Sequence, residues 1–205
     1  MSLKAKYTTI GKNVSRPDAA EKSTGQAIFG VDLKQPRMAI GKLLTSRVPH
    51  ARIRRIDASR ATRLRGVYAV VTGADAPQRR YGFFKDQPVL AAEKVRCIGD
   101  PVAAVAACDE ETAEEALSLI RVDLDELPAV FDPHAAMQDG APILHENLAE
   151  YEAIWKGKRW GNVNVYSNIE FGDPERGFAE SDECYEDVFT TQKLHQGYLE
   201  PHAVL

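Results

Sequence analysis

Residues 95–128, VRCIGDPVAAVAACDEETAEEALSLIRVDLDELP, decide the fold class. The apolar run 102–107 predicts a strand, and Asp109 follows it as a typical helix N-cap, with two glutamates placed favourably against the helix dipole. An apolar stripe at helical spacing then predicts a helix that faces a sheet. Its residues are Ala113, Ala116, Leu117 and Ile120. The chain returns as RVDLDEL (121–127), whose alternation predicts a half-exposed strand. Strand, helix and strand together indicate an α/β unit.

Upstream, the pattern predicts further strands around one short helix. GQAIFGVDL (25–33) has strand-like composition, and MAIGKLLTS (38–46) alternates small and large apolar residues. In ARIRRID (51–57) the isoleucines alternate only imperfectly with arginines, so we expect an edge strand. ASRATRLRG (58–66) predicts a short helix that ends on a left-handed glycine cap. VYAVVTG (67–73) is continuously apolar and predicts a strand covered on both faces.

Downstream, the α/β pattern stops. FDPHAAMQDGAPILHENL predicts a polar connector with a helical turn, and residues 150–162 have no period. NVNVYSNIEFGD is extended, Asp173 and Pro174 begin a predicted short helix, and the stretch from Glu183 to the end is expected to be strand-rich. These last pieces carry too few apolar residues for a core. We therefore expect an arm at 1–15, an α/β domain at 16–132, a connector at 133–161 and an incomplete further domain at 162–205.

Composition excludes several classes of function. The 205 residues hold 26 Lys plus Arg against 30 Asp plus Glu, a net charge of −4, which gives no support to nucleic-acid binding. The arginine-rich stretch 51–66 is interpreted as a solvated strand and helix surface, and a polyanion site is the less favoured alternative. No apolar run is long enough for a membrane span and the N-terminus has no signal-peptide core, so we expect no membrane association and a cytoplasmic protein. Cys97, Cys108 and Cys184 form no Cys-x-x-Cys pair and are expected to be buried or idle thiols.

The terminal stretch LHQGYLEPHAVL brings His195, Glu200 and His202 within eight positions. Imidazole and carboxylate suit zinc or iron, but this spacing matches no helical pair, and on a strand His195 points away from the other two. A structural strand is the favoured interpretation. Two roles for Glu200 stay open, a place near an assembled active site or the capping of backbone N–H groups.

Other candidate residues receive structural interpretations. Gly99 and Asp100 predict a tight turn rather than a phosphate loop, because the stretch lacks G-x-G-x-x-G and Pro101 removes a backbone donor. His50 is expected near a strand start with a hydrogen-bonded partner. The carboxylates of DEETAEE and DLDEL are expected to be solvated. Trp155 and Trp160, in a basic stretch with Lys156, Lys158 and Arg159, are a candidate partner surface.

Several segments, in order, resemble the N-terminal part of the large subunit of the molybdenum hydroxylases, the xanthine dehydrogenase and aldehyde oxidase family. They include RPDAAEKSTGQAIFGVDL, SRVPHARIRRID, GVYAVVTGAD and PVLAAEKVRCIGDPVAAVAACDEETAEEAL, followed by LPAVFDP, APILHEN, NIEFGDPERGFAESD and HQGYLEPHAVL. The resemblance runs from about Arg16 to the end. It implies an α/β hammerhead domain, a mixed sheet packed with helices, followed by the start of a molybdopterin-binding domain.

The resemblance also implies cofactors and partners. In such enzymes a molybdenum centre held by a pterin dithiolene hydroxylates carbon with water-derived oxygen, and electrons leave through two 2Fe–2S clusters and usually FAD on other subunits or domains. The expected partners are the rest of the large subunit, an iron–sulfur subunit and an FAD subunit. The family's pterin loops and catalytic glutamate have no counterpart before Leu205. We therefore expect no catalytic, cofactor-binding or metal-binding residue and no activity in this chain alone.

Three hypotheses follow. The first is a structural segment or short subunit of a molybdenum hydroxylase that acts on a heterocycle, an aldehyde or an aromatic substrate. The second is an independent binding or assembly module with the hammerhead fold and no redox chemistry. The third, ranked last, is a metal-dependent hydrolase built on His195, Glu200 and His202.

Overall fold

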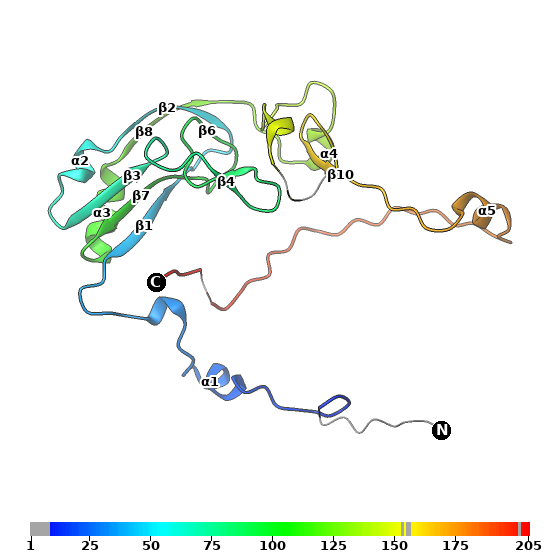
Figure 1. Ribbon diagram of the computed structural model, residues 1–205, viewed down its shortest axis with the longest axis horizontal. Helices are drawn as coiled ribbons and strands as arrows, with labels where there is room; N and C mark the ends of the chain where they lie inside the picture. Colours follow the sequence, from blue (N-terminus) through cyan, green and yellow to red (C-terminus); the bar gives the residue numbers. More distant parts are fainter. Residues whose placement is uncertain (1–8, 153, 155–156, 201) are drawn as a thin grey trace. The chain divides into compact units, whose positions relative to one another are not determined.

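The computed structural model describes residues 9–152, 154, 157–200 and 202–205. Its contacts divide the chain into two units, Arg37–Cys184 and a smaller unit made of the segment that ends at Pro36 and the segment that begins at Tyr185. The elements, labelled as in Figure 1, are in chain order α1 Ala19–Thr24, η1 Gly30–Asp32, β1 Ile40–Thr45, β2 Ala51–Asp57, α2 Ser59–Thr62, β3 Val67–Thr72, β4 Arg80–Tyr81, β5 Gln87–Pro88, β6 Lys94–Val95, β7 Pro101–Ala107, α3 Glu110–Leu119, β8 Arg121–Glu126, α4 Pro133–Ala136, η2 Leu148–Glu150, β9 Lys158–Trp160, β10 Val163–Tyr166 and α5 Pro174–Ala179.

The first sheet has the order β1-β7-β3, with both pairs antiparallel, and the helices α2 and α3 pack on one of its faces. Small side chains make this packing close, since Ala103, Ala107, Ala113 and Ala116 are all fully buried. Asp109 accepts a hydrogen bond from the backbone N–H of the third helical residue of α3 at 2.8 Å. The predicted strand, N-cap, helix and apolar stripe are therefore confirmed.

The second sheet has the order β6-β2-β8 and is also antiparallel. Its apolar residues pack around a second core cluster that includes the fully buried Val95. The half-exposed return strand, β8, is confirmed. The prediction of an edge position for residues 51–57 is wrong, because β8 pairs along β2 and β6 pairs with Ala51 and Arg52 on the other side.

The prediction that residues 67–73 form a strand covered on both faces is also wrong. We expected both of its faces to be covered, but β3 is an edge strand of the first sheet, and Tyr68 is 65% exposed. The helices cover only one face of this sheet, so outward-facing side chains of β3 stay exposed. Two glycines shape its ends. Gly66 has the predicted left-handed φ, +94°, and a Cβ on Gly73 would lie 2.3 Å from the carbonyl oxygen of Ala91.

Two further strand predictions are wrong. Residues 25–33 contain the short 3-10 helix η1 instead, because Asp32 accepts a hydrogen bond from the Phe29 N–H at 3.0 Å and closes a local turn. The described residues after Glu183 form no strand. A strand needs a neighbour for its backbone groups, and the described residues provide no partner strand to this segment.

The connector is held by polar side chains, and its predicted helical turn is α4, N-capped by Asp132. Asn162 donates to the carbonyl oxygens of Ala136 and Pro142, and its own side-chain oxygen accepts from the Leu144 N–H at 2.9 Å. Helix α5 is confirmed with Asp173 as its N-cap. In the described part of the chain, no helix has the length and apolar character of a membrane span.

Candidate functional site

Two of the terminal residues that raised the metal hypothesis, His195 and Glu200, accept hydrogen bonds from backbone N–H groups. His195 Nδ1 accepts from the Gly197 N–H at 3.0 Å, and Glu200 Oε1 accepts from the Gly30 N–H at 3.2 Å. His202 lines a hollow of about 560 Å³ within the same small unit. Across the described residues, no three His, Cys, Asp or Glu side chains are grouped to hold a metal ion. Of the two roles considered for Glu200, the geometry supports the capping of a backbone donor.

His50 has the hydrogen-bonded partner that the sequence predicts. It is 4% exposed, and its Nδ1–H donates to the carbonyl oxygen of Pro128 at 2.6 Å, which joins the start of β2 to the end of β8. Because a carbonyl can only accept, this contact places the proton on Nδ1. The other ring nitrogen, Nε2, is buried and has no hydrogen-bond partner among the described residues.

The predicted tight turn at Gly99 is also confirmed. Gly99 has φ +98°, and the Asp100 carboxylate accepts from the N–H groups of Arg96 at 2.6 Å and Cys97 at 3.2 Å. These two backbone donors are therefore occupied by the protein's own carboxylate. The Cys97 thiol donates to the same side chain at 2.9 Å, and burial raises its pKa to about 11, with help from the Asp100 contact.

All three cysteines are free and exposed, so of the two expected alternatives, buried or idle thiols, the buried one is wrong. Trp160 is half exposed and lies on β9 beside Tyr166, with ring centroids 5.8 Å apart. Trp155 and Lys156 lie outside the described residues. The candidate partner surface built on the two tryptophans therefore stays a prediction.

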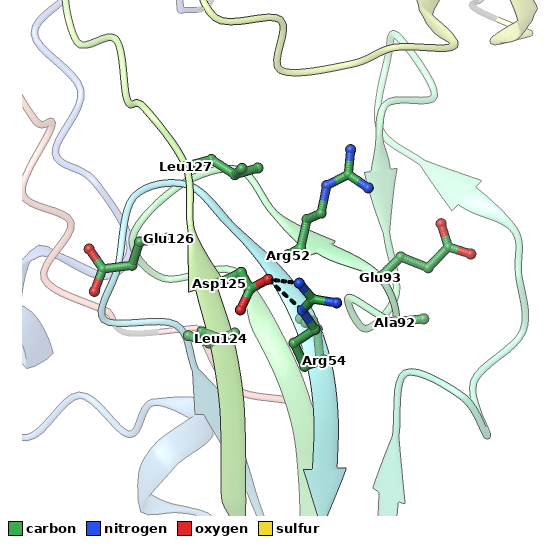
Figure 2. A pocket seen from close by; sticks show the side chains of 9 residues that line it. Arg52, Arg54, Ala92, Glu93, Leu124, Asp125, Glu126 and Leu127 are labelled. Carbon is green, nitrogen blue, oxygen red and sulfur yellow. Dashed lines mark hydrogen bonds and ion pairs between the residues drawn. The ribbon is translucent and has the colours of Figure 1, made fainter.

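The abundant carboxylates are solvated, as expected, and several pair with cations. Lys42 donates to Glu110 at 2.6 Å and to Glu114 at 2.7 Å, and these hydrogen bonds raise the pKa of Lys42. A broad groove of about 980 Å³ lies over β2 and β8. Figure 2 shows its lining side chains, among which Arg54 forms an ion pair with Asp125. Paired charges on an open strand surface are typical of structural ion pairs rather than of a reactive site.

A more unusual group of charges lies beside this groove. The cationic pocket, of about 280 Å³, is lined by Arg52, Arg80, Glu93, Lys94, Arg96, Glu146, Asn147 and Tyr151. Lys94 is only 7% exposed, and its ammonium donates to Glu146 at 2.8 Å and to the Ile143 carbonyl oxygen at 3.0 Å. These residues come from four separate stretches of chain, so sequence reasoning did not group them. Two local signals were the arginine-rich stretch that contains Arg52 and the KVR sequence, in which Arg96 directly follows the short buried strand β6.

His145 lies next to the cationic pocket, and its Nδ1 is 3.0 Å from the Tyr151 hydroxyl. Burial is the largest cause that lowers the pKa of His145, to about 4. The positive charges of Arg96, Arg80 and Lys94 lower this pKa further, whereas Asp86 raises it. The imidazole is thus neutral at physiological pH, and the local field is dominated by cations.

The first sheet has one face without covering helices. On this uncovered face, Leu43 lies beside Ala104 and Val71, and Gly41 lies beside Ala106 and Ala69, as the strand register shows. Leu43 is 56% exposed, whereas its neighbour Leu44 points to the helix side and packs against both core clusters. The uncovered face is therefore apolar and flat at its centre.

Residues 24–128 match the family described as aldehyde oxidase and xanthine dehydrogenase, a/b hammerhead domain. The nicotinate dehydrogenase large molybdopterin subunit of Eubacterium barkeri is 33% identical over 96% of this chain and 44% of that protein. The carbon monoxide dehydrogenase large chain of Afipia carboxidovorans is 33% identical over 95% of this chain and 25% of that protein. The chain thus spans less than half the length of these relatives.

Solved structures agree with the sequence relatives. The reconstituted CO dehydrogenase from Oligotropha carboxidovorans superposes with a TM-score of 0.59 at 38% identity, over 66% of this chain and 18% of that one. The match to the family spans the two sheets, their helices and both core clusters described above. By the extent of that match, this chain belongs to the aldehyde oxidase and xanthine dehydrogenase family and carries its a/b hammerhead domain.

Proposed function

We propose that this chain is a structural segment of the large subunit of a molybdenum hydroxylase, whose remainder carries the catalytic centre. The observation that supports this most directly is the uncovered face around Leu43, because exposed apolar side chains gathered on one face of a sheet are typical of a packing interface. Exposed apolar side chains continue in the last segment of the chain, where Tyr185, Val188 and Phe189 are each at least 85% exposed. Both surfaces suit a role in packing against the rest of the subunit.

The hollow near the chain end, which contains Glu200 and His202, does not fit a molybdopterin. Such a group needs a cradle of backbone and side-chain donors around a dithiolene and a phosphate. The hollow near the chain end contains Glu200, whose carboxylate would repel a phosphate, and the Gly30 N–H already donates to that carboxylate. We infer that the cofactor of the complete enzyme, with its molybdenum, is held by other parts of the protein. Iron–sulfur and FAD subunits are proposed as further partners, and the cytoplasm as the compartment.

The proposal is tested by co-expressing this chain with a polypeptide that supplies the remainder of the large subunit. We expect the two to co-purify and Leu43→Lys to weaken their association about tenfold or more, since an interface leucine contributes about 1.5–3 kcal/mol. The melting temperature of the chain alone should be unchanged by this substitution. Leu44→Lys is the matched control, because it places an ammonium in the core and should unfold the chain.

Two outcomes contradict the proposal. If the unaltered chain does not associate with the remainder, an independent binding module becomes the better account. If the chain purified alone contains stoichiometric molybdenum by elemental analysis, the assignment of the cofactor to other parts of the protein is wrong.

A further inference from the structure

The cationic pocket is rigidly built from segments that are distant in sequence. Lys94 and Arg96 extend from the β6 region and hold the connector, where Arg96 Nε donates to the Leu144 carbonyl oxygen at 2.8 Å. Arg80, the first residue of β4, donates to the Asp86 carbonyl oxygen at 2.9 Å, and its guanidinium carbon lies 4.4 Å from the centre of the Tyr151 ring. These contacts fix the cations in position without neutralising most of them.

The charges that line the pocket do not balance. Four cations face two carboxylates, Glu93 and Glu146, which leaves a net charge of 4 − 2 = +2. Glu146 already pairs with Lys94. The guanidinium groups of Arg80 and Arg96 donate only to carbonyl oxygens in the hydrogen bonds of the described structure. Like charges held this close repel one another, and a bound anion would relieve that repulsion.

Arg52, an exposed residue, completes the lining of the pocket. It lies on β2, directly beside Lys94 in the strand register. Its guanidinium makes no hydrogen bond or ion pair with the other described residues, and Figure 2 shows it extending away from the Arg54–Asp125 pair. A guanidinium with unused donors is suited to bidentate recognition of an oxyanion.

We propose that the cationic pocket binds a phosphate dianion, either inorganic phosphate or the phosphate group of a small phosphomonoester. The volume of about 280 Å³ accommodates a phosphate with room for a small ester substituent. Arg52, Arg80 and Arg96 supply guanidinium donors, and the buried Lys94 adds positive charge. This site is separate from the uncovered face and does not depend on the proposed function.

The test uses the full chain with phosphate, glycerol phosphate or chloride at equal ionic strength. Binding is followed by calorimetry and by amide chemical shifts of the pocket residues. We expect saturable binding of phosphate with a dissociation constant near or below about 1 mM, and no saturation with chloride. Tighter binding of glycerol phosphate than of phosphate assigns the site to phosphomonoesters, and the reverse order assigns it to the free ion.

Two variants are expected to change the affinity for phosphate in opposite directions, which makes the test specific. Arg52→Gln should weaken binding about tenfold, whereas Glu93→Gln should strengthen it several-fold because it removes a repelling carboxylate. Arg54→Gln is the control with the same change of net charge, and it should leave the dissociation constant unchanged. The proposal is overturned if phosphate does not saturate, if Arg54→Gln weakens binding as much as Arg52→Gln, or if Glu93→Gln has no effect.

Discussion

Replacing Gly73 by alanine tests the close approach between the end of β3 and the chain at Ala91. The added Cβ would lie 2.3 Å from the Ala91 carbonyl oxygen and 2.6 Å from the Ala92 Cα. Non-bonded atoms reach their best separation at about 3.5–4.0 Å, so the backbone must move by about 1 Å. Ala91 cannot yield freely, because it is buried and its N–H donates to the Pro101 carbonyl oxygen at 2.7 Å.

Overpacking costs about 1–3 kcal/mol, and loss of the Ala91 hydrogen bond adds about 0.5–1.5 kcal/mol. We therefore expect Gly73→Ala to lower the free energy of unfolding by about 2–4 kcal/mol, measured by urea denaturation followed by circular dichroism. Gly41→Ala is the matched control, since no atom of the described residues lies within 4 Å of its added Cβ. That variant should be neutral or stabilise by up to about 1 kcal/mol. Equal stability of the Gly73→Ala variant and the unaltered chain would refute this account of the packing.

Three further substitutions or measurements test single contacts. Glu146→Gln should lower the free energy of unfolding by about 1 kcal/mol at neutral pH, because it leaves the buried Lys94 without its charged partner, and the cost is moderate since Glu146 is half exposed. Burial raises the pKa of Glu146, but the hydrogen bond and charge of Lys94 outweigh burial and lower this pKa below 4.5. The difference in the free energy of unfolding between the variant and the unaltered chain should therefore shrink as the pH falls below 4.5. Asp109→Ala should destabilise α3, because it removes the N-cap. Hydrogen bonds from the first turn hold the pKa of Asp109 below 3.8, so the loss of stability should be present at neutral pH and vanish in acid. Thermal melts of both proteins across pH measure this difference. The Cys97 thiol, with a pKa of about 11, should react with iodoacetamide at pH 8 more slowly than free cysteine in solution, and equal rates would contradict the Asp100 contact.

The sequence predicted those elements whose causes are local. The N-caps at Asp109 and Asp173, the helical stripe of α3 and the left-handed Gly66 depend on residues within a few positions, and all are confirmed. Which strand lies beside which depends on distant residues. The central position of β2 and the edge position of β3 follow from pairing with β6, β8 and β7, which periodicity does not reveal.

Predictions about candidate sites were likewise confirmed where they depended on local sequence and failed where they depended on distant residues. The structural interpretations of His50 and of the Gly99 turn are confirmed, because each rested on one short motif. The cationic pocket was missed, because Arg52, Arg80 and Lys94 converge only through tertiary structure. Strand-like composition also misled at residues 25–33, where the Asp32 side chain closes a turn, and after Glu183, where a strand pattern has no neighbour to pair with among the described residues.

The exposed aromatic and aliphatic side chains of the last segment have a thermodynamic consequence. Burial of apolar surface lowers the heat capacity, so a partner that covers Tyr185, Val188 and Phe189 would bind with a strongly temperature-dependent enthalpy. Binding of an anion by the arginines of the cationic pocket buries little apolar surface, so its affinity should instead depend on the salt concentration. Calorimetry at several temperatures and salt concentrations would therefore distinguish association through this segment from occupancy of the cationic pocket, even when both occur in one preparation.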